Sequence, residues 1–174
     1  MLILSDRRRT GGRSLPDALR GAPAVVLREK DLPRAQRVAL AAELRGWVDV
    51  LLVASDVFAG ADGTHLAAAD PFPARRPPIV GRSCHDHADL RRAAAEGCDY
   101  ATLSPIFPTS SKPGYGPALG VRSLAGSPLS VYALGGVTPL NAAACRHAGA
   151  AGVAVMGTAM STPDLAVLVE ALRR

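Results

Sequence analysis

The sequence has few cysteines, few aromatic residues and no long hydrophobic run. Cysteine occurs three times in 174 residues, and an odd number without metal-type spacing favours neither a disulfide framework nor a thiolate metal site. No apolar run reaches the roughly 18 residues of a membrane span, and the amino-terminal residues become charged too early for a signal peptide. We therefore expect a cytoplasmic protein with idle thiols and no membrane partner.

Signals for nucleic-acid binding are also missing. The formal net charge is +5 and aromatic residues make up 4% of the chain, but the aromatics are not interleaved with the basic residues. Apart from residues 7–9 and 75–76, the basic side chains are spread along the sequence without a continuous basic face. We expect no nucleic-acid partner. The mild positive balance suits attraction of anionic substrates and is equally common on a solvated surface.

What the sequence does contain is a regular alternation of strand and helix signals. Between most of the strand signals lie helix-like stretches bounded by capping residues, such as the stretch from Asp86 to Gly97 and the one from Thr138 to Gly149. This alternation predicts parallel strands with right-handed crossovers. Short apolar, β-prone runs recur eight times, at residues 2–4, 24–27, 48–53, 64–66, 78–80, 100–103, 130–134 and 152–156.

Eight repeats fit a closed barrel better than an open sheet, so we predict an α/β fold, a compact single-domain (β/α)₈ TIM barrel over residues 1–174. An open doubly wound sheet is the alternative, but no GxGxxG motif follows the first predicted strand to support a dinucleotide site. The chain is shorter than the roughly 200–250 residues usual for this barrel. Two short connections explain the length, because residues 5–23 hold only a truncated helix at 15–20 and residues 67–77 leave room for about one helical turn.

The last third of the sequence points to a phosphorylated substrate. Residues 131–139 and 151–158 are each a β-rich apolar run that stops at small residues and then at a helix start. A (β/α)₈ barrel uses two such units, after its seventh and eighth strands, to build a phosphate pocket from backbone N–H groups. A phosphorylated small molecule is therefore the first substrate class to consider.

Two cations lie at the end of the second predicted strand, where a barrel carries its active site. Arg28 and Lys30 are two residues apart, so on an extended strand they point to the same side, with Glu29 on the other. Two converging cations repel each other unless an anion lies between them, and a phosphate or diphosphate supplies that anion. The alternative is a solvated charged loop.

Asp56 and Asp70 follow the third and fourth predicted strands. Two carboxylates from neighbouring strand ends can hold one Mg²⁺ and leave coordination positions for water and phosphate oxygens. The alternatives are helix caps and ordinary loop carboxylates.

A hydroxyl-rich loop follows the sixth predicted strand. Residues 109–112 are Thr-Ser-Ser-Lys, a set of donors suited to an oxyanion and also typical of an ordinary loop. We interpret the adjacent residues 113–116 as a mobile flap that closes over substrate.

Histidines occur at two other predicted strand ends. The cluster from Cys84 to His87 is better explained by Asp86 capping a helix than by thiol or metal chemistry. His65 is either a hydrogen-bond donor in the pocket or a structural histidine. Neither position indicates a catalytic triad or dyad.

Taken together, these segments resemble the thiamine-phosphate synthase and thiazole tautomerase (TenI-like) superfamily over nearly the whole chain. Most of the matches are short, but their order and spacing are specific. The strongest are residues 104–112, residues 134–138 with Asn141, and residues 149–156, and the others are residues 4–7, 27–30, 55–56, 63–70 and 98–100.

Synthases of this superfamily join hydroxymethylpyrimidine diphosphate to a thiazole phosphate, forming thiamine phosphate and releasing diphosphate. The resemblance implies that Mg²⁺ binds Asp56 and Asp70, and that Gly136 with the backbone around Met156 and Gly157 holds the thiazole phosphate. It also implies a set of donors for the diphosphate, of which the first three take the catalytic role: Arg28, Lys30, Lys112, Ser83, Thr109 and Ser111.

This chemistry agrees with the lack of a triad. The leaving diphosphate gains charge, so cations and Mg²⁺ stabilise it more than they stabilise the ground state. The aminopyrimidine carries the resulting positive charge, and the thiazole nitrogen attacks without a catalytic base.

Several positions depart from the synthase pattern. Val26 stands where synthases usually carry Gln, Ser55 replaces the usual Asn before the metal-binding Asp, and Ala67 and Ala68 replace a Gly-Gln pair. Two other functions therefore stay open. One is a metal-independent thiazole phosphate tautomerase, although its catalytic histidine would fall at or beside Ser104. The other is a non-catalytic protein that binds thiazole phosphate or thiamine phosphate. Barrels of this kind often dimerise, so a homodimer is a further expectation.

Overall fold

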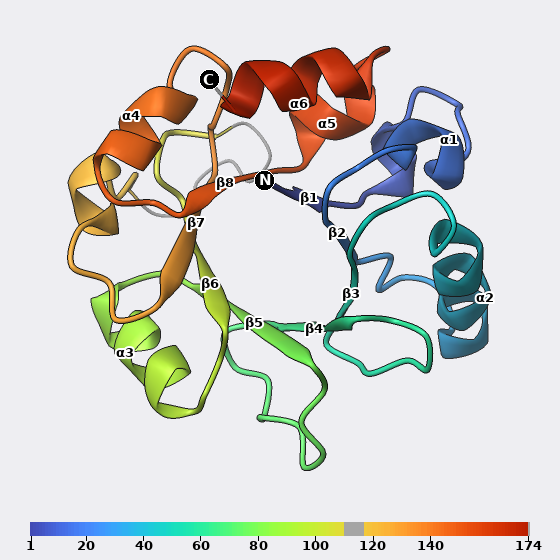
Figure 1. Ribbon diagram of the computed structural model, residues 1–174, viewed down its shortest axis with the longest axis horizontal. Helices are drawn as coiled ribbons and strands as arrows, with labels where there is room; N and C mark the ends of the chain where they lie inside the picture. The colour runs from blue at the N-terminus through green and yellow to red at the C-terminus, as the bar shows by residue number, and fades with distance from the viewer. Residues whose placement is uncertain (110–116, 174) are drawn as a thin grey trace.

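Eight parallel strands close into a barrel in the computed structural model, which describes residues 1–109 and 117–173. Each strand pairs with the next in sequence, and β8 pairs with β1. Figure 1 shows this ring end-on, with the helices outside it. The predicted closed barrel is confirmed, and the open-sheet alternative is wrong. The strands are β1 Leu2–Leu4, β2 Val25–Leu27, β3 Leu51–Ala54, β4 Gly63–Leu66, β5 Ile79–Cys84, β6 Tyr100–Leu103, β7 Ser130–Leu134 and β8 Gly152–Val155.

The barrel has two hydrophobic layers, because successive residues of a strand face opposite sides of the sheet. On β1, Ile3 packs in the large outer core beneath the helices, whereas Leu2 and Leu4 belong to a smaller cluster that fills the barrel interior. Val26 and Tyr100 are also members of this interior cluster. The interior cluster forms the apolar floor of any site at the carboxyl ends of the strands.

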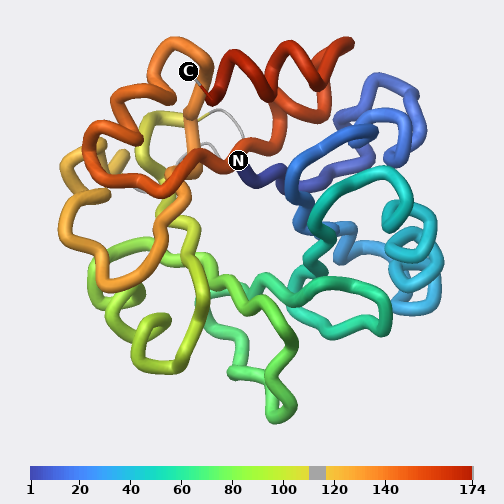
Figure 2. Tube along the Cα trace, in the orientation of Figure 1, coloured from blue at the N-terminus to red at the C-terminus, as the bar shows by residue number. Residues whose placement is uncertain are grey.

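The helices lie around the outside of the ring, and the tube in Figure 2 follows the chain from each strand out to its connection and back. Asp86 caps α3 as predicted, since its carboxylate accepts a hydrogen bond from the Asp89 N–H (2.7 Å). In the described residues the α-helices are α1 Leu15–Leu19, α2 Arg34–Leu44, α3 His87–Ala95, α4 Ala142–His147, α5 Gly157–Ser161 and α6 Leu165–Arg173, with 3₁₀ helices η1 Arg7–Arg9 and η2 Val121–Leu124.

α4 begins later than the sequence predicts. The predicted start is Thr138, and the observed first residue is Ala142. Asn141 explains the difference, because its side chain accepts a hydrogen bond from the Thr138 N–H (2.8 Å) and donates one to the Gly136 carbonyl (3.0 Å). These side-chain bonds replace helical bonds and close a turn between β7 and the helix.

Two strands differ by more than one residue from their predicted ranges. β3 was predicted at 48–53 and spans Leu51–Ala54, and β5 was predicted at 78–80 and spans Ile79–Cys84. β5 pairs with β6 as far as the contact between Cys84 and Leu103. Arg82 and Ser83 interrupt the apolar run, so hydrophobicity alone ended the predicted strand too early.

No helix covers the connections from β3 to β4 and from β4 to β5, both of which lie wholly within the described residues. The single helical turn expected within residues 67–77 does not form. Arg82 lies on the outer face of β5 instead, 1% exposed, and its guanidinium donates to the carbonyls of Ala67 (3.0 Å), Ala68 (3.2 Å) and Asp70 (2.8 Å). One buried side chain therefore satisfies backbone groups that a helix would satisfy internally.

The cysteines are buried and unpaired, as predicted. Burial raises the pKa of the Cys84 thiol to about 12, so this thiol stays protonated and unreactive at neutral pH. Among the described helices, none combines the length and the apolar character needed to cross a membrane.

Candidate active site

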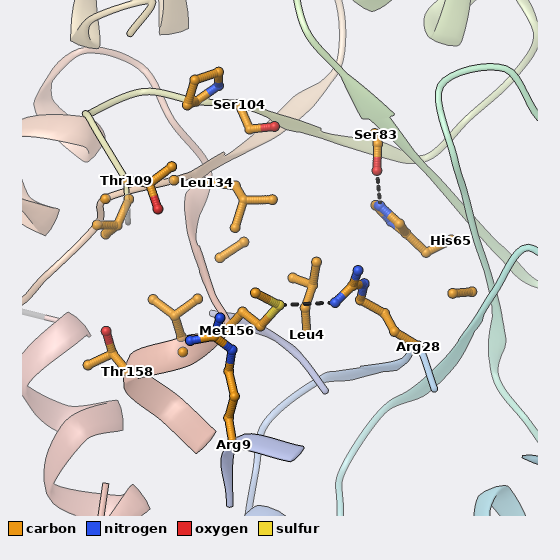
Figure 3. Close-up of a pocket in the computed structure, with 18 of the residues that line it drawn as sticks. Leu4, Arg9, Arg28, His65, Ser83, Ser104, Thr109, Leu134, Met156 and Thr158 are labelled. Atoms are coloured by element: carbon orange, nitrogen blue, oxygen red, sulfur yellow. Dashed lines mark hydrogen bonds between the residues drawn. The ribbon is translucent and has the colours of Figure 1, made fainter. Parts of the chain in front are cut away.

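A cavity of about 740 Å³ opens at the carboxyl ends of the strands. Figure 3 shows side chains from many strands converging on it. Its floor is apolar and its rim carries the polar groups, as expected for a small-molecule site. Each of the eight strands contributes a lining residue at its carboxyl end or just beyond it: Leu4, Arg28, Ala54, His65, Ser83, Ser104, Leu134 and Val155.

Arg28 and Lys30 both line this cavity, as the spacing predicts. Glu29 turns away and is buried, where it accepts hydrogen bonds from the Ser5 hydroxyl (2.6 Å) and the Arg7 N–H (3.2 Å). An Arg28 guanidinium nitrogen lies 3.0 Å from the Met156 sulfur, a soft and weak acceptor. The cation therefore remains available for a stronger anionic partner.

Lys30, Ser55 and Asp70 form a hydrogen-bonded chain at the rim. The Lys30 ammonium donates to the Ser55 hydroxyl (2.7 Å), which donates in turn to the Asp70 carboxylate. Ser55 has φ 56°, a left-handed conformation that Asn adopts more readily than Ser. This backbone geometry is a physical reason for Asn to be usual at such a position.

Neither of the two carboxylates predicted to bind metal lines the cavity. Asp56 forms an ion pair with Arg34 (3.1 Å), and its other close cation is Arg37 (4.0 Å). In the described residues, the hydrogen bonds to Asp70 all reach Oδ2, from Ser55 and from the Ala67 N–H. The second oxygen of Asp70 is thus open to a ligand.

Burial by itself raises the pKa of Asp70, but the hydrogen bonds from Ser55 and Ala67, with Lys30 and Arg82 nearby, outweigh burial and lower the pKa below its ordinary value. Asp70 is therefore an ionised carboxylate at neutral pH. Carboxylate oxygens are ligands that Mg²⁺ prefers, so the donor set fits this ion. Among residues 1–109 and 117–173, no group of three or more His, Cys, Asp or Glu side chains could hold a metal by itself. The pair would need phosphate oxygens and water to complete the coordination.

His65 lies in the cavity wall between two hydroxyls. Its Nδ1 is 2.8 Å from the Tyr100 hydroxyl and its Nε2 is 3.0 Å from the Ser83 hydroxyl. Burial, reinforced by Lys30 and Arg28, lowers the pKa of His65 to about 3. His65 is therefore a neutral side chain whose two ring nitrogens are both hydrogen-bonded to protein hydroxyls.

The far side of the cavity is built from backbone at the ends of β7 and β8. Gly135, Gly136, Met156 and Gly157 line it. Gly136 has φ +64°, and a Cβ at this position would lie 2.4 Å from the Pro108 carbonyl oxygen, so only glycine fits. The predicted glycine-rich half of the site thus lies on the cavity surface.

The hydroxyl-rich loop after β6 is described only in part. Thr109 lines the cavity, on the side away from His65 and Ser83 in Figure 3. Ser111 and Lys112 lie outside the described residues, as does the flap predicted at 113–116. Their predicted roles stay predictions.

The cluster from Cys84 to His87 does not form a nucleophile or metal site. Cys84 belongs to the outer core, Asp86 caps α3, and the His85 Nδ1 lies 2.9 Å from the Ser104 carbonyl oxygen. His85 lines the cavity but its ring is engaged with the backbone.

Arg9 is the main lining residue that the sequence analysis missed. It comes from η1, and in Figure 3 its side chain extends toward Met156 from the β1 side of the cavity. Thr138, Thr158 and Ser161 also line this region. Hydroxyl residues are common in loops, so the residue types alone do not indicate a binding site. The position of these residues after the predicted seventh and eighth strands is the only feature of the sequence that could have identified them.

Comparison with known proteins places this geometry in a family. A family model described as thiamine monophosphate synthase matches residues 4–159. The thiamine-phosphate synthase of Methanoculleus marisnigri is 36% identical over 99% of this chain and 93% of that relative, and the one of Roseiflexus castenholzii is 36% identical over 98% and 85%. A solved structure, the thiamine phosphate pyrophosphorylase from Pyrococcus furiosus, shares the fold, with a TM-score of 0.82, 24% identity and coverage of 99% of this chain and 92% of that chain.

Proposed function

The chain belongs to the thiamine monophosphate synthase family and synthesises thiamine phosphate, and we propose that its cavity holds the pyrimidine diphosphate and the thiazole phosphate side by side. The observation that carries this assignment is the two-sided cavity. Arg28 and Lys30 follow β2 and Ser83 lies on β5, whereas Gly136 and Gly157 follow β7 and β8, and all five line the cavity. One cavity thus offers two separate environments for anionic groups.

The diphosphate belongs on the Arg28 side. A planar guanidinium and a compact ammonium supply charge-assisted hydrogen bonds to phosphate oxygens. Ser83 lines the cavity as a further donor, and Thr109 lines it on the side away from Ser83 in Figure 3. Ser111 and Lys112 complete the predicted set in the sequence. Lys30 and Lys112 are the only two lysines among the 20 basic residues of the chain. Restriction of lysine to these two positions supports a role for both.

The reaction needs charge stabilisation rather than a base. The bond between the pyrimidine methylene carbon and the diphosphate oxygen breaks, and the thiazole nitrogen supplies the electron pair for the new carbon–nitrogen bond. Charge rises on the departing diphosphate, and Arg28 and Lys30 stabilise it at that moment. No proton is transferred in this step, which agrees with a neutral His65 whose two nitrogens are both hydrogen-bonded.

Mg²⁺ would bind Asp56 and Asp70. When bound, the ion adds positive charge beside the leaving diphosphate. Asp56 has to exchange its ion pair with Arg34 for the metal, whereas Asp70 has an oxygen open to it. Lys30 reaches Asp70 through Ser55, so the ammonium and this one carboxylate belong to one network, whereas Asp56 is paired with Arg34.

The thiazole phosphate belongs on the glycine-rich side. Backbone groups of Gly136, Met156 and Gly157 surround that part of the cavity, and Arg9 adds a cation to it. Val26, which stands where synthases usually carry Gln, is buried in the apolar interior cluster and does not line the cavity.

We also propose a cytoplasmic location, which three buried, unpaired cysteines support. Small phosphorylated molecules are then the partners, without nucleic acid or membrane. The homodimer stays a prediction.

The test is an assay of purified protein with hydroxymethylpyrimidine diphosphate and thiazole phosphate, following thiamine phosphate by mass. Product should require Mg²⁺, disappear with EDTA and return when Mg²⁺ is added in excess. Lys30→Met should lower kcat/KM by about 100-fold, a typical loss for one donor to a developing negative charge.

Arg91→Met is the matched control, because Arg91 is an exposed cation on α3, outside the barrel. It should retain full activity. Undiminished turnover in Lys30→Met would overturn the diphosphate assignment, and undiminished turnover in EDTA would overturn the metal assignment. Binding of both substrates without product would identify a non-catalytic binding protein.

A further inference from the structure

A line of three polar side chains runs from the barrel interior to the cavity. Tyr100 on β6 contacts His65 on β4 (2.8 Å), and His65 contacts Ser83 on β5 (3.0 Å). Tyr100 and His65 are 7% and 4% exposed, and His65 and Ser83 both line the cavity. Figure 3 shows the bond between His65 and Ser83 in the cavity wall.

Packing holds the Tyr100 ring in place. A Cβ on Gly81 would lie 2.1 Å from the Tyr100 ring, so the ring occupies the space that the glycine leaves. The ring stacks on His65 with centroids 5.5 Å apart, and Tyr132 packs edge-on against it at 5.6 Å. The Tyr100 hydroxyl is therefore fixed opposite the histidine ring.

The hydroxyl hydrogen of Tyr100 decides the direction of the hydrogen bonds. Within the part of the chain that the structure describes, His65 is the only hydrogen-bond partner of this hydroxyl. Burial raises the pKa of Tyr100, so the hydroxyl keeps its proton, and a buried O–H without an acceptor is costly. Tyr100 must therefore donate to the His65 Nδ1.

The tautomer of His65 follows from this donation. A neutral imidazole carries one N–H, and with Nδ1 accepting from Tyr100 the hydrogen lies on Nε2. Nε2 then donates to the Ser83 oxygen. The hydroxyl hydrogen of Ser83 is left free to point into the cavity.

We propose that Tyr100 and His65 are positioning residues that turn Ser83 into a hydrogen-bond donor for the diphosphate group of the substrate. The inference rests on the proposed function, which places the diphosphate beside Arg28 and Ser83. In the opposite tautomer Ser83 would donate to His65 and present only lone pairs to an anion. A hydroxyl that is already oriented as a donor needs no reorganisation when negative charge develops on the diphosphate.

The donor direction does not change with pH in the physiological range. Besides burial, the charged groups that act on His65 are Lys30, Arg28 and Arg82, which disfavour its protonation, and Asp70, which favours it. The cations and burial prevail. His65 therefore keeps one hydrogen, on Nε2, while the enzyme works.

The tautomer can be observed directly by NMR with ¹⁵N-labelled histidine. The chain has four histidines, and the signals of His65 are those lost in His65→Gln. We expect the Nε2–H tautomer, unchanged between pH 5 and pH 8. An Nδ1–H tautomer or an imidazolium in the wild-type protein would overturn the proposal. This measurement needs neither substrate nor activity, so its outcome is independent of the proposed function.

The consequence for Ser83 is tested by calorimetry with inorganic diphosphate. Tyr100→Phe removes the donor to Nδ1 and should weaken diphosphate binding about tenfold, as Ser83→Ala should. The double variant should bind no more weakly than Ser83→Ala, because both changes remove the same hydrogen bond. Additive losses, or unchanged binding in Tyr100→Phe, would contradict the proposal that Tyr100 and His65 position the Ser83 hydroxyl.

Tyr132→Phe is the matched control, since it removes a hydroxyl from the neighbouring ring. It should leave both the tautomer and diphosphate binding unchanged. The variants could show these losses of diphosphate binding while the wild-type protein makes no thiamine phosphate. That result would support the positioning of Ser83 and contradict only the proposed reaction.

Discussion

Three consecutive arginines at the end of β1 have three different environments. Arg7 pairs with Glu29 (3.2 Å) and Asp31 (2.7 Å), and Arg8 is 72% exposed beside Asp6 (3.6 Å). Arg9 also contacts Asp6 (3.2 Å), but it alone of the three lines the cavity. A cation at this position suits a ligand phosphate on the glycine-rich side.

We expect Arg9→Met to raise the KM for thiazole phosphate about tenfold, the loss of one charge-assisted hydrogen bond. The KM for the pyrimidine diphosphate should stay within about twofold, because Arg28 and Lys30 hold that group. Steady-state kinetics with each substrate varied in turn measure both values. Arg8→Met is the control and should change neither, and an equal rise of both KM values in Arg9→Met would reject the assignment.

At the scale of elements, the connection from β4 to β5 is the most unusual part of the barrel. It has no helix, and three arginines donate to its carbonyls, Arg76 to those of Pro77 and Pro78 from within the connection, and Arg82 and Arg92 from outside it. Arg82 is buried and binds three of them, besides an ion pair with Glu96 (2.7 Å). Arg92 binds the Ala68 carbonyl (2.9 Å) from the surface, with its side chain 48% exposed. The buried arginine therefore has the structural role.

Arg82→Met should lower the free energy of unfolding by about 3 kcal/mol, because buried carbonyls and the Glu96 carboxylate lose their partner. Arg92→Met, which affects the same connection from the surface, should cost less than about 1 kcal/mol. Urea unfolding followed by circular dichroism measures both. Similar losses in the two variants would show that the buried position has no special role.

Elements were predictable where local signals and packing agree. Three strands match their predicted ranges, because in each the apolar run has the same extent as the segment that pairs with neighbouring strands. They are Leu2–Leu4, Tyr100–Leu103 and Ser130–Leu134. The start of α4 and the end of β5 were not predictable, since a side-chain turn at Asn141 and pairing with β6 decide them.

At the scale of the whole molecule, the buried His65 links folding to pH. Its pKa is about 3 in the folded protein and 6.5 ordinarily. Above pH 6.5 the side chain is neutral in both states. As the pH falls below 6.5, His65 binds a proton in the unfolded chain but stays neutral in the folded protein. The free energy of unfolding therefore decreases until the pH reaches about 3.

We expect the free energy of unfolding to fall by about 1.4 kcal/mol per pH unit between roughly pH 6 and pH 4 from this residue. His65→Gln lacks the group, so its stability should depend less steeply on pH in the same window, whatever its absolute stability. Denaturant titrations at a series of pH values measure the two slopes. The amino terminus, whose pKa burial lowers, acts equally in both proteins and cancels. Equal slopes would mean that His65 titrates normally in the folded protein.

The sequence by itself determined the barrel, the family and most of the polar rim of the site. Strand–helix alternation repeats along the chain, and side-chain alternation on an extended strand needs no tertiary information, which is why Arg28 and Lys30 were placed together with Glu29 turned away. Only the tertiary structure decided which of the arginines at the end of β1 reaches the cavity, how Asp56 is paired, and how Tyr100, His65 and Ser83 share their hydrogens. These contacts join residues that lie 18 to 35 positions apart, and their geometry depends on the register of neighbouring strands, which no local pattern encodes.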